Sequence, residues 1–275
     1  MRSFQVKRFH DLLILCFFML AMAGCQNDKA KEAGNSSASA AAVSDTAHAD
    51  GKSIGIILQD NNGEDYNPVI DPANFVGTID NPYCALTPGK VWVYEGMDED
   101  GTKERVEIEV TPDQKTILGV AITVVRERAW EDGELVEDTL DWFAQDKDGN
   151  VWYFGEDSKD IEDGQVVSTK GSWEAGVNGA KAGMVMKGSP QVGDAYRQEF
   201  LKGEAEDMGQ VLSVGEAVRI GLANYENCVQ TKDWTPLEPD LVEHKFYSKE
   251  AGNVILEKKI AGGSGQIELI EIKNQ

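Results

Sequence analysis

Four Asp-Gly pairs separate segments that are rich in β-branched and aromatic residues, and this spacing strongly constrains the fold. The pairs lie at positions 100–101, 132–133, 148–149 and 163–164. Asp-Gly is a preferred sequence for tight hairpin turns, because glycine readily adopts the positive φ that such turns require. Consecutive strands are therefore predicted to be joined as hairpins. This pattern indicates an antiparallel meander and disfavours βαβ units.

About eleven strand-like segments follow residue 91, and little helix is expected among them. Residues 111–116 are predicted to be a connector, residues 171–194 an irregular glycine-rich excursion, and residues 202–208 a short helical turn. The predicted fold class is all-β, with a large and strongly bent antiparallel sheet. Half-barrel, closed barrel and sandwich share the same period of two, so the pattern leaves all three open.

Residues 1–24 have a basic start, a short apolar run and small residues before Cys25, which is typical of a signal peptide. The ending Ala23-Gly24-Cys25 resembles the lipobox of bacterial lipoproteins, in which this cysteine becomes the lipidated first residue. The alternative, an uncleaved anchor helix, is disfavoured because the run is short for a membrane span. Gln26 at the next position resembles the Gram-negative pattern for sorting to the outer membrane, facing the periplasm or the cell surface. In a Gram-positive host the anchor would face outward from the plasma membrane.

Four regions are predicted along the chain. Residues 1–24 form the signal peptide, and residues 25–52 form the lipidated cysteine and a small, polar, flexible tether. Residues 53–90 are rich in Asn, Asp, Pro and Gly, and we expect an ordered lead-in loop there. Residues 91–275 form a single β domain.

The chain is strongly acidic, with a formal net charge of −22. Removal of the signal peptide takes away three basic residues and one acidic residue, so the mature chain carries −24. Such a surface repels nucleic acid and anionic lipid headgroups, so neither is expected as a direct partner. Membrane attachment is expected through the N-terminal lipid only. A small polar ligand, or a glycan or protein of the envelope, remains open as a partner.

Two cysteines remain once Cys16 is removed with the signal peptide and Cys25 is assigned to lipid. These are Cys84 and Cys228. An even number of cysteines in an oxidising compartment favours one disulfide over two buried thiols.

Histidine is too scarce for most metal or nucleophilic chemistry. The mature chain keeps His48, in the tether, and His244, so a centre with several histidines is excluded. A Ser-His-Asp arrangement would need His244, and no nucleophile-elbow motif accompanies it. Strand alternation places His244 on one face with Val242 and Phe246. A satisfied core histidine is favoured there over a ligand-contacting one.

The segment 146–150 has the composition of a calcium loop. Asp146, Asp148 and Asn150 fill the first three ligand positions of the EF-hand pattern, but Val151 and Asp157 stand where glycine and glutamate are required. A hairpin turn needs the same residues, so it is favoured over a metal site. No cofactor is expected, and calcium stays a minor alternative.

An acid beside aromatic rings is the strongest candidate for a binding site. Extended alternation places Trp152, Phe154 and Glu156 on one face of a strand. Whether Asp141 joins them depends on the hairpin register. A three-residue loop pairs Trp142 with Phe154 and is favoured, whereas a four-residue loop pairs Asp141 with Phe154.

Aromatic and acidic side chains together can stack sugar rings or hold a cation, although a purely structural role is also open. Glu174, Glu206 and Asp207 lie in two acidic loops that can converge with Glu156 to form a cleft. Non-catalytic binding of a small polar or carbohydrate-like ligand is the favoured function. A hydrolase that uses paired carboxylates is the first alternative, so enzymatic activity is uncertain and less favoured. A structural or envelope-assembly protein is the second.

Several long motifs resemble a family of bacterial secreted proteins and lipoproteins. They include "NPYCALTPGKVWVYEG", "DWFAQDKDGNVWYFGED", "GSWEAGVNGAKAGMVM", "YRQEFLKGEAEDM", "CVQTKDWTPLEP" and "HKFYSKEAGNVILE". The motifs span residues 80–272. The resemblance implies one coherent domain, and it assigns no activity, cofactor or site residue.

Overall fold

The computed structural model describes residues 65–274. The predicted signal peptide, the lipidation at Cys25, the tether and the first part of the lead-in lie outside this range. Within it there is one 3-10 helix and no α-helix, and no helix there has the length and apolarity to cross a membrane. The elements are η1 (Pro72–Asn74), β1 (Phe75–Val76), β2 (Lys90–Met97), β3 (Lys103–Ile117), β4 (Val120–Glu131), β5 (Glu134–Asp146), β6 (Val151–Asp157), β7 (Asp160–Glu162), β8 (Gln165–Ser168), β9 (Trp173–Glu174), β10 (Lys181–Met186), β11 (Ala195–Arg197), β12 (Glu199–Phe200), β13 (Met208–Arg219), β14 (Asn224–Thr235), β15 (Glu238–Ser248), β16 (Asn253–Ala261) and β17 (Gln266–Asn274).

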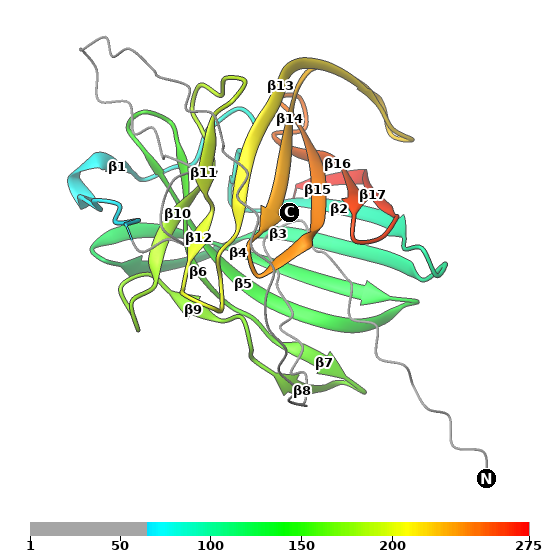
Figure 1. The fold of residues 1–275 in the computed structure, drawn as a ribbon, viewed down its shortest axis with the longest axis horizontal. Helices are drawn as coiled ribbons and strands as arrows, with labels where there is room; N and C mark the ends of the chain where they lie inside the picture. Colours follow the sequence, from blue (N-terminus) through cyan, green and yellow to red (C-terminus); the bar gives the residue numbers. More distant parts are fainter. Residues whose placement is uncertain (1–64, 275) are drawn as a thin grey trace, which may run out of the picture.

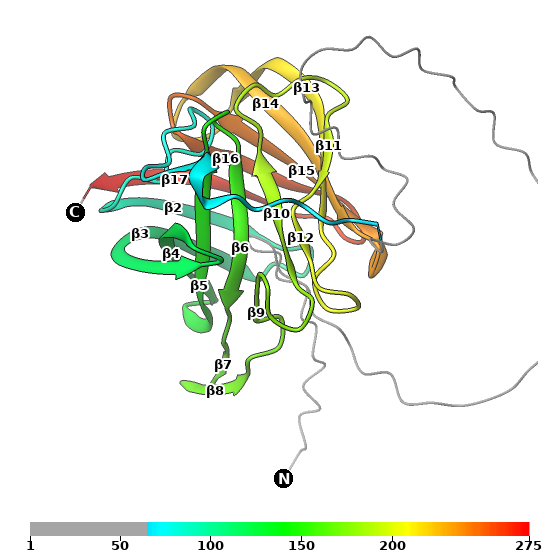
Figure 2. The ribbon, with the colours of Figure 1, turned by 90° about the vertical axis from the view of Figure 1, so that its left-hand side faces the viewer.

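The strands form one antiparallel sheet that curls into a nearly closed barrel shape (Figures 1 and 2). Strands β2 to β6 pair in sequence order, and so do β13 to β17. Pairing of β17 with β2 joins these two series on one side. On the other side β10 pairs with β6 and β12, and β11 pairs with β13. The prediction of a bent, all-β antiparallel sheet is confirmed.

The Asp-Gly pairs make the predicted hairpin turns. They join β2 to β3, β4 to β5, β5 to β6 and β7 to β8. In the β4–β5 turn both Asp132 (φ 47°) and Gly133 (φ 93°) have positive φ, as a two-residue type I′ turn requires. The glycines of the other three turns also have positive φ.

Three local predictions are wrong. Residues 111–116 are not a connector, because β3 continues through them past a bulge and turns only at Leu118-Gly119. The glycine-rich segment 171–194 contains β9 and β10, and β10 completes the ring of pairings. Residues 202–208 are not helical but form a turn closed by a bridge between Leu201 and Ala205. The sheet therefore has seventeen strands instead of about eleven, and several of the added strands are only two to four residues long.

A bulge divides the β5–β6 hairpin into two registers. Next to the turn, Phe143 pairs with Tyr153, which is the register that the three-residue loop predicts. Beyond the bulge the register shifts by one residue, and Asp141 pairs with Glu156. Because a shift of one residue exchanges the two faces of a strand, Glu156 does not share the face of Trp152 and Phe154. The predicted triad on one face is wrong for this reason.

The interior of the barrel-shaped sheet has an apolar half and an acidic half. Toward the β5–β6 turn, the buried inward residues of neighbouring strands are apolar and aromatic, for example Ile108, Val125, Phe143 and Tyr153. Toward the opposite end, the inward positions carry carboxylates such as Glu127 and Glu137. On the outer face the same strands carry half-buried ion pairs, such as Arg126 with Asp138 at 2.6 Å.

The lead-in covers the apolar end of the sheet. Gln145 at the end of β5 anchors it: Oε1 accepts hydrogen bonds from the backbone N–H groups of Asp80 and Asn81, and Nε2 donates to Asp80 Oδ1. Leu86 and Cys84 then reach the core beside Phe143. The lead-in from residue 65 onward covers this end of the interior.

The predicted disulfide between Cys84 and Cys228 is not formed. Both residues are buried free cysteines of the hydrophobic core. Cys84 sits in the lead-in plug, and Cys228 sits on β14 opposite Glu216 of β13. Burial raises the pKa of the Cys84 thiol to about 12 and that of Cys228 to about 11. Both cysteines serve as small apolar core residues.

Candidate functional site

Eight buried carboxylates line the acidic half of the interior, and we call them the interior carboxyl cluster. On β4, β5, β14, β15 and β16 they alternate with outward-facing residues, so the period of two directs them inward. The bulge of β6 turns Glu156 inward, and Glu199 of β12 lies beside Trp173. One lysine, Lys245 on β15, lies among them. The members are Glu127 of β4, Glu137 and Asp141 of β5, Glu156 of β6, Glu199 of β12, Asp233 of β14, Glu243 of β15 and Glu257 of β16.

One side of the cluster combines acids with aromatic rings. Tyr153 donates a hydrogen bond to Asp141 Oδ1 at 2.7 Å, and Trp173 Nε1 donates to Glu199 Oε2 at 3.0 Å. The two rings contact each other edge to face, with centroids 5.3 Å apart. Glu156 stands opposite Asp141, and the neighbouring charges of Asp141 and Glu199 act on it.

The other side surrounds Lys245. Its Nζ lies 3.5 Å from Asp233 Oδ2 and 3.7 Å from Glu257 Oε2. Asp233 is further held by hydrogen bonds from Gln198 Nε2 at 3.0 Å and from Thr231 Oγ1 at 2.6 Å. Asp233 is therefore well satisfied, in contrast to several of its neighbours.

Many carboxylate oxygens of the cluster have no hydrogen-bond partner among the described residues. Neither oxygen of Glu127 has a hydrogen-bond partner, and this residue is only 2% exposed. One oxygen makes no hydrogen bond in each of Asp141 (Oδ2), Glu156 (Oε2) and Glu243 (Oε1), whereas Glu257 Oε2 has Lys245 as its ion-pair partner. Buried polar atoms are paired in most proteins, so this concentration of unpaired acceptors marks an unusual site.

Burial raises the pKa of every cluster carboxyl for which a shift is resolved. The pKa of Glu137 rises to about 8, and those of Asp141 and Glu257 rise to about 7. The pKa values of Glu127 and Glu156 lie well above the ordinary value, because desolvation and then the charge of Asp141 disfavour their ionised forms. Desolvation also raises the pKa of Glu199 and Glu243 well above the ordinary value. The next largest cause is the charge of Asp207 for Glu199 and the charge of Glu257 for Glu243. Such shifts concentrate at functional sites.

Three of the predicted ligand-binding residues meet here. Asp141 and Glu156 are cross-strand partners, and Asp207 lies next to the cluster. The backbone N–H of Asp207 donates to Glu199, and desolvation is the main cause that raises the pKa of the Asp207 carboxyl to about 7.

The other predicted residues lie elsewhere. Trp152 faces away from Glu156, and its Nε1 donates to Asp146 Oδ2. Glu174 forms an ion pair with Lys115 at 2.8 Å. Glu206 accepts a hydrogen bond from the backbone of Gly203. None of these contacts brings the three residues into the cluster.

His244 is also outside the cluster, on the outer face of β15. Its Nδ1 lies 2.9 Å from Gln230 Nε2, and desolvation lowers the pKa of its half-buried ring. It is satisfied, as the favoured interpretation held, but it does not face the core. The inward residues of β15 are Glu243, Lys245 and Tyr247.

Sequence reasoning missed seven residues of this region: Glu127, Glu137, Glu199, Asp233, Glu243, Lys245 and Glu257. A signal was present, because in the β4, β15 and β16 segments charged residues occupy positions on both faces. In a strand with one face in the core, charges at successive positions indicate that one of them points inward.

The segment 146–150 is a structural turn. Asp146 accepts hydrogen bonds from the backbone N–H groups of Asp148 and Asn150, from Asn150 Nδ2 and from Trp152 Nε1. Asn150 Oδ1 accepts from Gly188 N. The Asp146 carboxylate and the Asn150 amide oxygen, two of the three candidate calcium ligands, are therefore engaged in the turn. Among residues 65–274, no group of three or more His, Cys, Asp or Glu side chains is placed to hold a metal ion.

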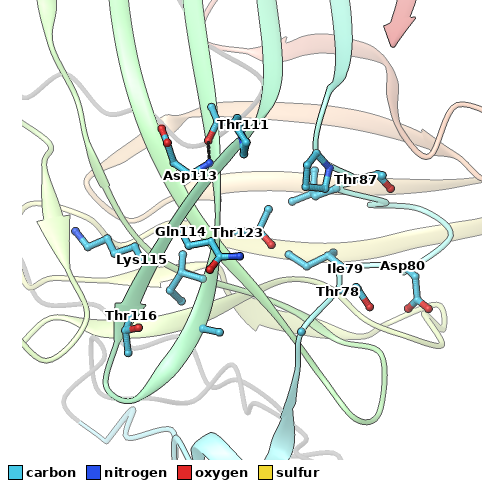
Figure 3. A pocket seen from close by; sticks show the side chains of 16 residues that line it. Thr78, Ile79, Asp80, Thr87, Thr111, Asp113, Gln114, Lys115, Thr116 and Thr123 are labelled. Carbon is cyan, nitrogen blue, oxygen red and sulfur yellow. Dashed lines mark hydrogen bonds between the residues drawn. The ribbon is translucent and has the colours of Figure 1, made fainter. Parts of the chain in front are cut away.

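A solvent-open cleft of about 690 Å³ lies at the other end of the molecule, between the lead-in and the β3–β4 hairpin (Figure 3). The β3 bulge forms part of its wall, where Thr111 Oγ1 donates to Val124 O and accepts from Asp113 N. Figure 3 shows Gln114 and Thr123 on the hairpin side, facing Ile79 of the lead-in.

Six polar side chains of this cleft make no hydrogen bond or ion pair with other described residues. They come from both walls, and the apolar residues Ile79, Leu86 and Ile122 lie between them. The volume falls within the range of small-molecule sites, which combine apolar walls with a few polar groups. The six are Thr78, Thr87, Asp113, Gln114, Thr116 and Thr123.

Comparison with known proteins gives two similar structures. One is a protein of Bacteroides fragilis, inferred to be exported and described as having a YmcC-like fold; it is 13% identical with a TM-score of 0.43, over 70% of this chain and 99% of that one. The other is an inferred lipoprotein of Parabacteroides distasonis, 10% identical with a TM-score of 0.39, over 70% of this chain and 98% of that one. No family model and no curated protein matches the chain. At these identities and scores, the similarity assigns no function.

Proposed function

We propose that this protein is a lipid-anchored lipoprotein of the cell envelope that binds a small polar, carbohydrate-like ligand without chemical conversion. The cleft between the lead-in and the β3–β4 hairpin is the binding site. One observation carries this proposal: a cleft of ligand size, open to solvent, holds six polar side chains with no described partner. The lipobox-like sequence at Cys25 supports the anchor, and Gln26 supports the outer membrane.

The lining favours a neutral, hydroxyl-rich ligand. Threonine hydroxyls and the Gln114 amide both donate and accept hydrogen bonds, as sugar hydroxyls require. Two of the three charged residues of the lining are engaged, since Asp80 accepts from Gln145 and Lys115 pairs with Glu174, and Asp113 is the third. Ile79, Leu86 and Ile122 can contact the apolar face of a sugar ring.

Calorimetric titration with maltose, cellobiose and chitobiose tests this function. At least one sugar should bind, and binding should weaken about tenfold in Thr123→Val, since a lost hydrogen bond to a ligand costs about 1 kcal/mol or more. Gln114→Met should weaken it likewise. Thr169→Val, which removes an exposed hydroxyl outside the cleft, is the matched control. If none of the three sugars binds at millimolar concentration, or if Thr123→Val binds like the parent, the assignment to the cleft is wrong.

The anchor has its own test. Labelled palmitate should be incorporated into the chain and should be absent from Cys25→Ala, and the labelled protein should fractionate with the outer membrane of a Gram-negative host. Label that remains in Cys25→Ala would overturn the lipidation.

Hydrolysis is the second candidate, favoured by the pairing of Asp141 with Glu156 across β5 and β6. Two carboxyls with raised pKa values can divide general acid and base roles. Their burial argues against it, because Asp141 is 0% and Glu156 3% exposed. Turnover of a glycoside that is lost in Glu156→Gln, with the fold intact, would establish it.

A further inference from the structure

The interior carboxyl cluster has an excess of negative groups that its own surroundings do not balance. Burying a carboxylate is unfavourable unless it is paired and hydrogen-bonded. Of the buried charged residues in the described chain, ten are carboxylates and two are basic, namely Arg197 and Lys245. Arg197 stacks near Phe200, 5.0 Å from its ring centroid, while Lys245 lies with Asp233 and Glu257.

Glu127 shows this deficit most directly. It is 2% exposed, and neither of its oxygens has a partner among the described residues. Its cross-strand neighbours are Ile108 on β3 and Thr139 on β5, and Thr139 Oγ1 donates to Glu137 instead. The adjacent residue Arg126 points outward and binds Asp138 at two points. The strand thus provides a cation on its outer face and none for Glu127.

The unpaired acceptors are spread across the interior and do not converge on one point. Those of Asp141 and Glu156 lie on the β5–β6 side, whereas that of Glu243 lies on β15. No three acids are placed to hold a metal ion within residues 65–274. A cation with separated charges and several N–H donors fits such a distribution better than a compact metal ion.

Aromatic rings adjoin the acids on one side. Tyr153 and Trp173 pack edge to face and each donates a hydrogen bond to a cluster acid. Rings beside carboxylates bind ammonium groups through the ring quadrupole together with charge. This combination indicates an ammonium group as the partner at Asp141, Glu156 and Glu199.

Asp207 adds a further acid beside the cluster. It follows the turn at residues 201–205 and adjoins both Glu199 and Lys245. Its Oδ1 lacks a partner among the described residues. The opposite, apolar end of the interior is closed by the lead-in.

We infer that the interior carboxyl cluster is a binding site for a small aliphatic di- or polyamine, whose ammonium groups donate to Glu127, Asp141, Glu156 and Glu243. The inference is independent of the cleft, which lies at the other end of the molecule.

Calorimetric titration of the full chain with putrescine and spermidine tests this site. At least one amine should bind, and Glu127→Gln should weaken it about tenfold or more, since a charge-assisted hydrogen bond is worth roughly 1.5–3 kcal/mol. Glu134→Gln, an exposed residue at the start of β5, makes the same charge change and should bind like the parent. The neutral isostere 1,4-butanediol should not bind.

A second readout separates the site from non-specific attraction to an acidic surface. Binding of ammonium groups should displace protons from the cluster, so the measured heat should change between buffers of different ionisation enthalpy. Circular dichroism confirms that each variant is folded. Failure of both amines to bind at millimolar concentration, or equal weakening in Glu127→Gln and Glu134→Gln, would overturn the inference. Equal binding of calcium, competing with putrescine, would also overturn it.

Discussion

Asp141 on β5 and Glu156 on β6 stand directly opposite each other inside the sheet, and both are almost completely buried. Tyr153 provides one hydrogen bond to this pair, to Asp141 Oδ1, while Asp141 Oδ2 and Glu156 Oε2 have no partner among the described residues. Two carboxylates this close cannot both ionise cheaply, so the pair holds at least one proton well above the ordinary pKa. The pair belongs to a larger cluster, and the cluster makes stability depend on pH.

Stability should fall as the pH rises from about 5 to about 9. A carboxyl whose pKa is raised in the folded state stabilises the protein below its unfolded pKa, and this contribution is lost as the pH rises through the folded pKa. The relevant folded pKa values are about 7 for Asp141 and Glu257 and about 8 for Glu137. We expect the Tm at pH 5.5 to exceed that at pH 8.5 by on the order of 5 °C or more.

Glu137→Gln provides the check on this pH dependence. Its amide is neutral at every pH, so the variant should have a smaller difference in Tm between the two pH values than the parent. Glu134→Gln, exposed on the same strand, should keep the full difference. If the Tm of the parent rises toward pH 8.5, the prediction is wrong, because the cluster carboxyls would then be ionised in the folded protein and stabilised by neighbouring positive charges or hydrogen bonds.

Gly155 should be intolerant of any side chain. It has φ 127° in the bulge of β6, and an added Cβ would lie 2.2 Å from the carbonyl oxygen of Trp173. Gly155→Ala should therefore lower the free energy of unfolding by about 3 kcal/mol or more, through backbone strain and overpacking. Gly77→Ala, where nothing lies within 4 Å, is the control and should be within about 0.5 kcal/mol of the parent. Urea unfolding of both variants measures the difference, and equal midpoints would show that β9 can move away.

The meander could be predicted because its turns carry their own chemistry. Asp132-Gly133 and its three equivalents occur where the chain must reverse, and the residues between them alternate or are apolar. The register next to the β5–β6 turn followed from loop length alone, since Phe143 and Tyr153 pair as a three-residue loop requires.

The candidate site could not be predicted in the same way. One bulge at Gly155 moves Glu156 from the face of Trp152 to the face of Asp141, and a bulge has no reliable local signal. Glu199 on β12 joins the cluster because β10 pairs with both β6 and β12. Strand β10 lies in the glycine-rich segment 171–194, and its pairing with β6 is long-range in sequence. The interior is the product of such non-local pairings, and no single motif encodes it.

Cys84 and Cys228 should remain reduced in the exported protein. Both are buried free thiols with raised pKa values, so few thiolates are available for oxidation. Peptide mapping after alkylation should give no label at either cysteine in the native protein and full label at both after unfolding in guanidinium. A reductant should leave the Tm unchanged. A cross-linked peptide containing Cys84 and Cys228 would contradict this prediction.

Asp146 should stabilise the folded protein and should not bind calcium. Its carboxylate receives four hydrogen bonds, from the N–H groups of Asp148 and Asn150, the Asn150 amide and the indole of Trp152. Asp146→Ala would leave the buried Trp152 N–H unpaired, and we expect a loss of about 2–4 kcal/mol, seen as a Tm lower by roughly 5–10 °C. Asp148→Ala removes an exposed carboxylate that the turn does not use, and its Tm should match the parent. Because the acceptors of Asp146 are already engaged by the protein, millimolar calcium should shift the Tm of neither the parent nor Asp148→Ala. A calcium-dependent rise in the parent that Asp148→Ala abolishes would restore the metal loop and remove the purely structural role of the turn.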